Sequence, residues 1–173
     1  MSDLQGRRVA FLVTNGYEPS ELYSPWDTVV DNGGEAVLIS PESGEVSGKD
    51  HSQKVDLDVA DANAEDYDAL VLPGGTKNAD QLRMNKDAVK FTKAFFDADK
   101  TVASICHAAW MLAEADVVKG RNMTSYPSLQ TDLRNAGANW SDEELVVDGN
   151  LITSRTPKDL PAFNEAIVNK LTE

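Results

Sequence analysis

The sequence has few of the residues on which cross-links and metal sites depend. Its 173 residues include a single cysteine, Cys106, and two histidines, His51 and His107. One cysteine excludes an intramolecular disulfide and a structural zinc site built on several thiolates. Neither a GxGxxG fingerprint nor a Walker loop occurs, so the sequence does not point to a bound nucleotide. We therefore expect no cofactor and no metal ion.

Long apolar segments and an excess of basic residues are also lacking. The longest apolar runs, such as residues 9–13 and 69–72, fall far short of the ~20 residues that a membrane span needs. The first six residues lack the apolar core of a signal peptide. The 29 acidic and 16 basic residues give a net charge of -13, which repels nucleic-acid phosphates and anionic lipids. These features predict a cytoplasmic protein that binds neither nucleic acid nor membranes.

Short apolar runs alternate with longer amphipathic stretches along the chain. Continuous apolar runs are typical of strands covered on both faces, and apolar residues three or four apart indicate helices. Strands are expected over residues 8–13, 35–40, 68–72 and 101–105, and helices over 21–32, 86–99, 107–118, 127–136 and 161–171. This alternation predicts right-handed βαβ units and a mostly parallel sheet in one α/β domain, residues 1–173.

Three segments are expected to add minor elements. Residues 41–64 are polar and contain glycine, which indicates a loop with a small hairpin or edge element, and His51 is expected at the surface there. Residues 123–126 are expected to form a short strand. Asp148-Gly149 indicates a hairpin between residues 145–147 and 151–153.

The loops at the ends of the predicted strands are where a ligand is expected, because parallel sheets bind ligands beyond the carboxyl ends of their strands. These loops are residues 15–22, 73–80 and 106–107. Cys106 comes directly after a strand and before a helix, the arrangement of a nucleophile elbow. The following helix N-terminus stabilises a thiolate, so we expect a lowered thiol pKa. The alternative is a buried cysteine that packs as a small hydrophobic residue.

Other residues of these loops are candidates for the same site. His107 is a candidate general base, with a ligand contact or a helix-start position as alternatives. Backbone N–H groups of the Gly74-Gly75 turn and of His107 are expected to form an oxyanion hole, unless the two glycines only make a tight turn. Glu18 and Glu21 are candidate acids beside the thiol, or ordinary first-turn acids of a helix.

Four segments together resemble the PfpI family, also called peptidase family C56 or general stress protein-like. They are Gly16–Leu22 (GYEPSEL), Leu72–Gly75 (LPGG), Ala103–Ala108 (ASICHA) and Thr153–Phe163 (TSRTPKDLPAF). The resemblance runs from about Val9 to the C-terminus and keeps motif order and spacing. The family belongs to the superfamily of the parkinsonism-associated protein deglycase and the class I glutamine amidotransferases. The resemblance implies a flavodoxin-like three-layer sandwich that assembles as a homo-oligomer, a dimer or a hexamer.

The resemblance also implies roles for individual residues. Cys106 matches the family nucleophile and His107 its adjacent histidine. Glu21 matches the acid that contacts the cysteine, and Glu18 a second nearby acid. The backbone groups of Gly75 and His107 match the oxyanion-hole donors.

Two positions depart from the family pattern. In proteases of the family an acid from the neighbouring subunit completes a Cys-His-Glu triad, and Asp80 stands at that position with a side chain shorter by one methylene. The family often has Gly-Pro after the histidine, whereas Ala108-Ala109 stands here, followed by Trp110. This implies a changed pocket wall, with Trp110 and Gly74 as candidate binding residues.

Three functions are compatible with these residues. The first is a stress-response enzyme that acts through a Cys106 thiolate on reactive carbonyls or on glycated substrates, as a glyoxalase or protein deglycase does. The second is an intracellular cysteine peptidase that acts on peptides and whose triad is completed by Asp80 across a subunit interface. The third is a non-enzymatic redox sensor or chaperone, in which Cys106 is oxidised to a sulfinate.

Overall fold

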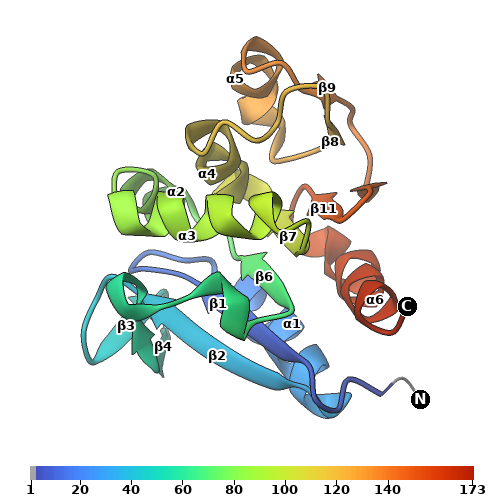
Figure 1. The fold of residues 1–173 in the computed structure, drawn as a ribbon. Helices are drawn as coiled ribbons and strands as arrows, with labels where there is room; N and C mark the ends of the chain where they lie inside the picture. Colours follow the sequence, from blue (N-terminus) through green and yellow to red (C-terminus); the bar gives the residue numbers. More distant parts are fainter. Residues whose placement is uncertain (1–2) are drawn as a thin grey trace.

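The computed structural model describes residues 3–173, and its centre is a seven-stranded sheet (Figure 1). The strand order is β10-β11-β7-β6-β1-β2-β5, and every neighbouring pair is parallel except β10 with β11. The strands are β1 (Arg8–Leu12), β2 (Glu35–Ser40), β5 (Leu57–Asp58), β6 (Ala69–Leu72), β7 (Thr101–Ile105), β10 (Val146–Asp148) and β11 (Leu151–Ser154). The five central strands follow the flavodoxin order 2-1-3-4-5, which confirms the predicted fold class.

Helices cover both faces of this sheet (Figure 1). One face carries α1 (Pro19–Asp31) and α6 (Leu160–Leu171), and the other carries α2 (Thr76–Leu82), α3 (Lys86–Asp97) and α4 (Ala109–Glu114), with α5 (Gln130–Asn135) packed on α4. Strand β1 shows why its run is continuously apolar. Val9 and Phe11 enter the core under α1 and α6, while Ala10 and Leu12 enter the core on the opposite face. Full burial of the larger side chains among them, Val9, Phe11 and Leu12, stabilises the fold by roughly 1.5–3 kcal/mol each.

Four short strands lie outside the main sheet. β3 (Glu45–Gly48) and β4 (His51–Lys54) form the hairpin expected within residues 41–64. β8 (Asn122–Met123) pairs in parallel with β9 (Asn139–Trp140). The hairpin around Asp148-Gly149 is present as β10 and β11. None of the helices within residues 3–173 has the length and apolarity of a membrane span.

Several predicted boundaries are wrong. The loop predicted over residues 73–80 contains α2, which lacks a side-chain cap at its N-terminus and whose apolar positions are only Ala79 and Leu82. The helix predicted over residues 107–118 begins as a single 3-10 turn and ends at Glu114. The strand expected over residues 123–126 stops at Met123. His51 lies in strand β4 and not in a loop.

Candidate active site

The carboxyl ends of β1, β6 and β7 open onto one cleft of about 430 Å³. Its walls come from the loop before α1, the turn after β6, the elbow after β7 and the tip of the β3–β4 hairpin. The lining residues are Gly16, Tyr17, Glu18, Pro19, Glu21, Lys49, Gly75, Thr76, Cys106, His107, Tyr126 and Pro157. The structure therefore brings the three loops chosen from the sequence into one site, as expected for this sheet topology.

Cys106 occupies a strained turn at the base of this cleft. Its φ of 63° lies in the left-handed region, which a non-glycine residue adopts only at a cost of about 1–3 kcal/mol. The side chain is 8% exposed, and the Cys106 carbonyl accepts a hydrogen bond from Tyr126 N at 3.1 Å. The strand, the strained cysteine and the following 3-10 turn have the geometry expected of a nucleophile elbow.

Glu21 is the acid that lies against the thiol. It is fully buried in the first turn of α1, and its Oε1 accepts a hydrogen bond from Gly74 N at 2.9 Å. Within the described residues its Oε2 is buried and has no hydrogen-bond partner, which leaves the Cys106 thiol as the neighbouring group that can share a proton with it. Glu18 lies at the mouth of the cleft instead, where its Oε1 accepts from Ser20 Oγ at 3.1 Å.

Burial and, secondarily, the charge of a neighbouring carboxylate hold protons on both Glu21 and Cys106: Glu18 acts on Glu21, and Glu21 acts on Cys106. Burial raises the pKa of Glu21 from 4.5 to about 8, against the opposing hydrogen bond from Gly74. Burial and then the negative charge of Glu21 raise the pKa of Cys106 to about 12, while backbone N–H groups of His107 and Gly75 oppose this rise. The prediction of a lowered thiol pKa is therefore wrong, chiefly because the thiol is buried. A protonated Glu21 removes that repulsion and can donate a hydrogen bond to a thiolate.

We expect Glu21 to make the protein less stable as the pH rises. Its native pKa of about 8 lies above its ordinary value of 4.5, so between these values the unfolded chain loses a proton that the native protein keeps. In that window the contribution of Glu21 to the free energy of unfolding falls by up to about 1.4 kcal/mol per pH unit. Urea unfolding across the window should show this fall in the wild type relative to Glu21→Gln.

The control for this prediction is Glu42→Gln, which removes one negative charge from an exposed position. Glu42→Gln should shift the plot of unfolding free energy against pH up or down relative to the wild type, without changing its slope. Parallel curves for the wild type and Glu21→Gln would contradict a carboxyl group that stays protonated in the native protein.

The two glycines after β6 are required by close approaches of the backbone. A Cβ atom at Gly74 would meet Glu21 Oε1 and would lie 2.8 Å from Cys106 Cβ. Gly75 has a φ of 97°, and a Cβ atom there would lie 2.5 Å from Gly16 O and 2.6 Å from Glu18 N. With the side chains absent, the N–H of Gly75 and that of His107 reach the Cys106 sulfur. These are the two donors predicted for an oxyanion hole; directed at the sulfur, they favour the thiolate form of Cys106, and the oxyanion hole stays a prediction.

His107 is held beside the thiol as a neutral imidazole. Its Nδ1 lies 3.3 Å from Cys106 Sγ, and its Nε2 lies 3.4 Å from Thr76 Oγ1. The ring stacks on Tyr126 with 4.5 Å between centroids. Burial lowers the pKa of His107, so the ring is available as a proton acceptor near neutral pH.

Three predicted residues do not line the cleft. Gly74, a candidate binding residue, instead donates its N–H to Glu21 Oε1 beneath the cleft lining. Asp80 lies on the exposed face of α2, where its Oδ2 accepts a hydrogen bond from Gln81 at 3.2 Å, and within residues 3–173 no carboxylate hydrogen-bonds His107. Trp110 meets the edge of the His107 ring at 5.3 Å between centroids, while its Nε1 donates to Asp132. Trp110 therefore supports His107 from behind, and the family role of Asp80 would need a second subunit.

Sequence reasoning missed several residues that shape the site. Asn78 is fully buried, accepts from Thr14 N at 2.7 Å and donates to the carbonyls of Pro73 and Gly74, so it fastens two strand ends together. Thr76, Tyr126, Lys49 and Pro157 line the cleft. Thr76 falls inside a loop already chosen from the sequence. Asn78 falls inside the same loop, and Pro157 falls inside the Thr153–Phe163 segment that carries the resemblance. Nothing in the sequence around Lys49 and Tyr126 signals that they line the cleft.

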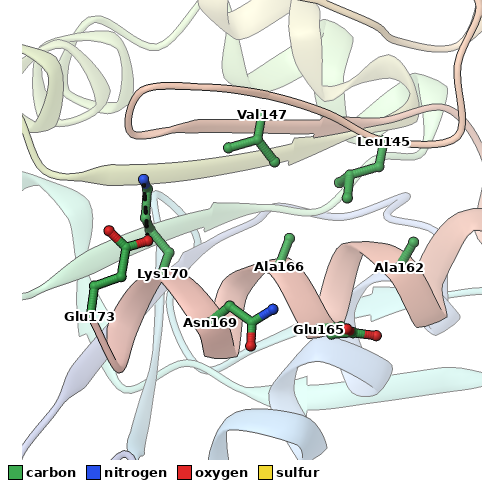
Figure 2. Close-up of a pocket in the computed structure, with 8 residues that line it drawn as sticks. All are labelled: Leu145, Val147, Ala162, Glu165, Ala166, Asn169, Lys170 and Glu173. Atoms are coloured by element: carbon green, nitrogen blue, oxygen red, sulfur yellow. Dashed lines mark ion pairs between the residues drawn. The ribbon is translucent and has the colours of Figure 1, made fainter.

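A second hollow lies between β10 and α6, remote from Cys106. Figure 2 shows Leu145 and Val147 facing Ala162 and Ala166 across this groove of about 360 Å³. Its lining is half aliphatic and half polar or charged, and includes no cysteine or histidine. Within residues 3–173 no cluster of potential metal ligands occurs either. The chemistry of the chain therefore points to the cleft at Cys106.

Comparisons with known proteins show the family to which the chain is similar. The sequence model of the DJ-1/PfpI family matches residues 7–170. "Deglycase PH1704" of Pyrococcus horikoshii is 43% identical over 165 residues, which cover 95% of this chain and 99% of that protein. "Putative cysteine protease YraA" of Bacillus subtilis is 44% identical over 168 residues, covering 95% and 98%. A two-domain protein of Anabaena variabilis, with DJ-1/ThiJ/PfpI-like and ferritin-like domains, aligns with a TM-score of 0.93 at 36% identity, over 95% of this chain and 48% of that chain.

Proposed function

The chain belongs to the DJ-1/PfpI family, and we propose that it is a stress-response enzyme that uses Cys106 to act on reactive carbonyls or their protein adducts, as a glyoxalase or deglycase. The observation that carries the proposal is the contact between a strained, nearly buried thiol and a fully buried carboxyl group, beneath two convergent backbone N–H groups. This arrangement suits a small carbonyl substrate, whose oxygen gains negative charge when a thiolate adds to its carbon.

The proposed reaction with methylglyoxal begins with transfer of the Cys106 thiol proton to Nδ1 of His107, and the resulting thiolate adds to the aldehyde carbon. A sulfur–carbon bond forms, and the electron pair of the carbonyl π bond moves to oxygen, which the N–H groups of Gly75 and His107 stabilise. Protonation of this oxygen gives a hemithioacetal. His107 or Glu21 then removes the proton from the former aldehyde carbon and returns one to the neighbouring carbon, which produces a lactoyl thioester. Water hydrolyses the thioester, releasing lactate and the free thiol.

The test is the product formed by the wild-type protein from methylglyoxal, measured beside the release of peptides from casein. We expect lactate, because the site supplies a nucleophile, an oxyanion hole and a proton carrier, and no casein cleavage. Absence of lactate would overturn the proposal. Absence of both products, with a peroxide-dependent mass gain at Cys106, would favour the redox role instead.

A cysteine peptidase is the second candidate, favoured by the name of the YraA relative and by the long 3.4 Å contact between Thr76 and His107. A carboxylate is the usual partner of a catalytic histidine, and that position is open to an incoming acid. This reading requires a homo-oligomer in which Asp80 of a partner subunit reaches His107. Casein cleavage by an oligomer, lost in Asp80→Ala, would support it over the carbonyl reaction.

A further inference from the structure

Lys49 lies at the mouth of the cleft and differs in charge from the rest of the lining. Among the lining residues within the described part of the chain, Lys49 is the one with a full positive charge near neutral pH, since the pKa of His107 is lowered. The other ionisable carboxyl and thiol groups of the lining are acidic: Glu18, Glu21 and Cys106. Within residues 3–173 Lys49 has no ion-pair partner. Its charge is thus available to a ligand.

The hairpin that carries Lys49 is fastened to the loop of the site. Lys49 and Asp50 form the two-residue turn between paired residues Gly48 and His51, with Asp50 at a φ of 54°. Tyr17, itself 2% exposed, meets His51 Nδ1 through its hydroxyl at 2.6 Å. Two backbone hydrogen bonds add to this contact: Gly16 N donates to Ser47 O at 2.8 Å, and Ser47 N donates to Asn15 Oδ1 at 2.8 Å.

The packing between hairpin and loop is also close. A Cβ atom added at Gly48 would lie 2.7 Å from Tyr17 O and 3.2 Å from Pro19 Cγ. The turn therefore has a fixed position over the cleft, and from it the exposed Lys49 lines the cleft.

We infer that Lys49 is a specificity-determining residue that binds a carboxylate on the carbonyl substrate, at the end remote from the carbon attacked by Cys106. The inference rests on the proposed function and deepens it, because it names the substrate class as carbonyl compounds that carry an acidic group. A lysine ammonium is a compact donor that binds such an anion by charge and hydrogen bonding. In a chain of net charge -13, a local cation is needed to offset repulsion of an anionic substrate.

The test uses Cys106 as its own reporter and does not depend on turnover. Cys106 is the single cysteine of the chain, so alkylation measured by intact mass reports on this site alone. Iodoacetate and iodoacetamide each form a sulfur–carbon bond and release iodide, but only iodoacetate carries a carboxylate. We expect the rate constant for iodoacetate divided by that for iodoacetamide to fall about three- to fivefold in Lys49→Met. This is the scale of the loss of an exposed ion pair. Lys49→Glu should lower it about tenfold, and salt should reduce both effects.

Lys54→Met is the matched control, because Lys54 is exposed on the same hairpin and does not line the cleft. It should leave the ratio unchanged. An equal ratio in the wild type, Lys49→Met and Lys49→Glu would overturn the inference. A lactate assay on the same proteins distinguishes the role of Lys49 from the proposed reaction. If the variants leave the alkylation ratio unchanged while the wild type forms lactate, only the role of Lys49 is refuted. If the ratio falls as expected but the wild type forms no lactate, only the reaction is refuted.

Discussion

Replacement of Cys106 by serine is expected to lower lactate formation from methylglyoxal at least about 10³-fold, the scale seen when an enzyme loses its nucleophile. A serine hydroxyl fits the same space, so the elbow and its φ of 63° are retained. Its oxygen is far more basic than sulfur and remains protonated in this buried position. The loss therefore reports chemistry and not packing. The measurement is the initial rate of lactate release.

Thermal unfolding provides the control for this variant. Cys106→Ser should unfold within a few degrees of the wild type, because one buried atom changes by little in volume. A folded serine variant that keeps more than about a tenth of the wild-type rate would show that another group carries the reaction.

Gly75→Ala is expected to destabilise the protein by about 3 kcal/mol and to lower turnover by about 10²-fold. The left-handed φ of 97° costs an alanine about 1–2 kcal/mol, and overpacking adds about 1–3 kcal/mol. The new methyl group would lie 2.5 Å from Gly16 O, a backbone atom that cannot rotate away. Displacement of the Gly75 N–H removes one proposed oxyanion donor, and loss of one such donor lowers turnover by about 10²-fold or more.

Gly44→Ala separates backbone strain from the close contact. Gly44 has a φ of 83°, but a Cβ atom there meets nothing within 4 Å. It should cost about 1–2 kcal/mol, the strain alone, with no effect on turnover. Equal unfolding free energies for the two variants, measured by urea denaturation, would contradict the account of the Gly75 turn.

Most of the central sheet was predictable from the sequence because its strands are buried on both faces. Continuous apolar runs such as Val9–Val13 have this one explanation in an alternating α/β chain. Helix α2 was not predictable in the same way, since only seven residues are helical and a buried Asn78 takes the place of an apolar residue on its inner face. The parallel pairing of β8 with β9 was also hidden, because each strand has two residues.

The location of the site was predictable because a lone cysteine and a Gly-Gly turn, each directly after a strand, have few structural roles. A lone cysteine between a strand and a helix and the Gly-Gly turn beside it led to the cleft. The choice between Glu18 and Glu21 needed the structure, because only burial distinguishes two acids three residues apart. The electrostatics also needed it, since the repulsion from Glu21 opposes the backbone donors that the sequence suggested. Tyr126 reaches His107 through tertiary packing that no local pattern encodes.

The central claim is that a reactive carbonyl adds to Cys106, and protection of this single thiol tests it most directly. Iodoacetamide alkylation of Cys106 is followed by intact mass while the methylglyoxal concentration is raised, with lactate release measured in parallel. The account predicts that alkylation slows as methylglyoxal rises, with half-protection at the concentration that gives half-maximal lactate release. Lactate release at its maximal rate while Cys106 is alkylated as fast as in the free protein would contradict it.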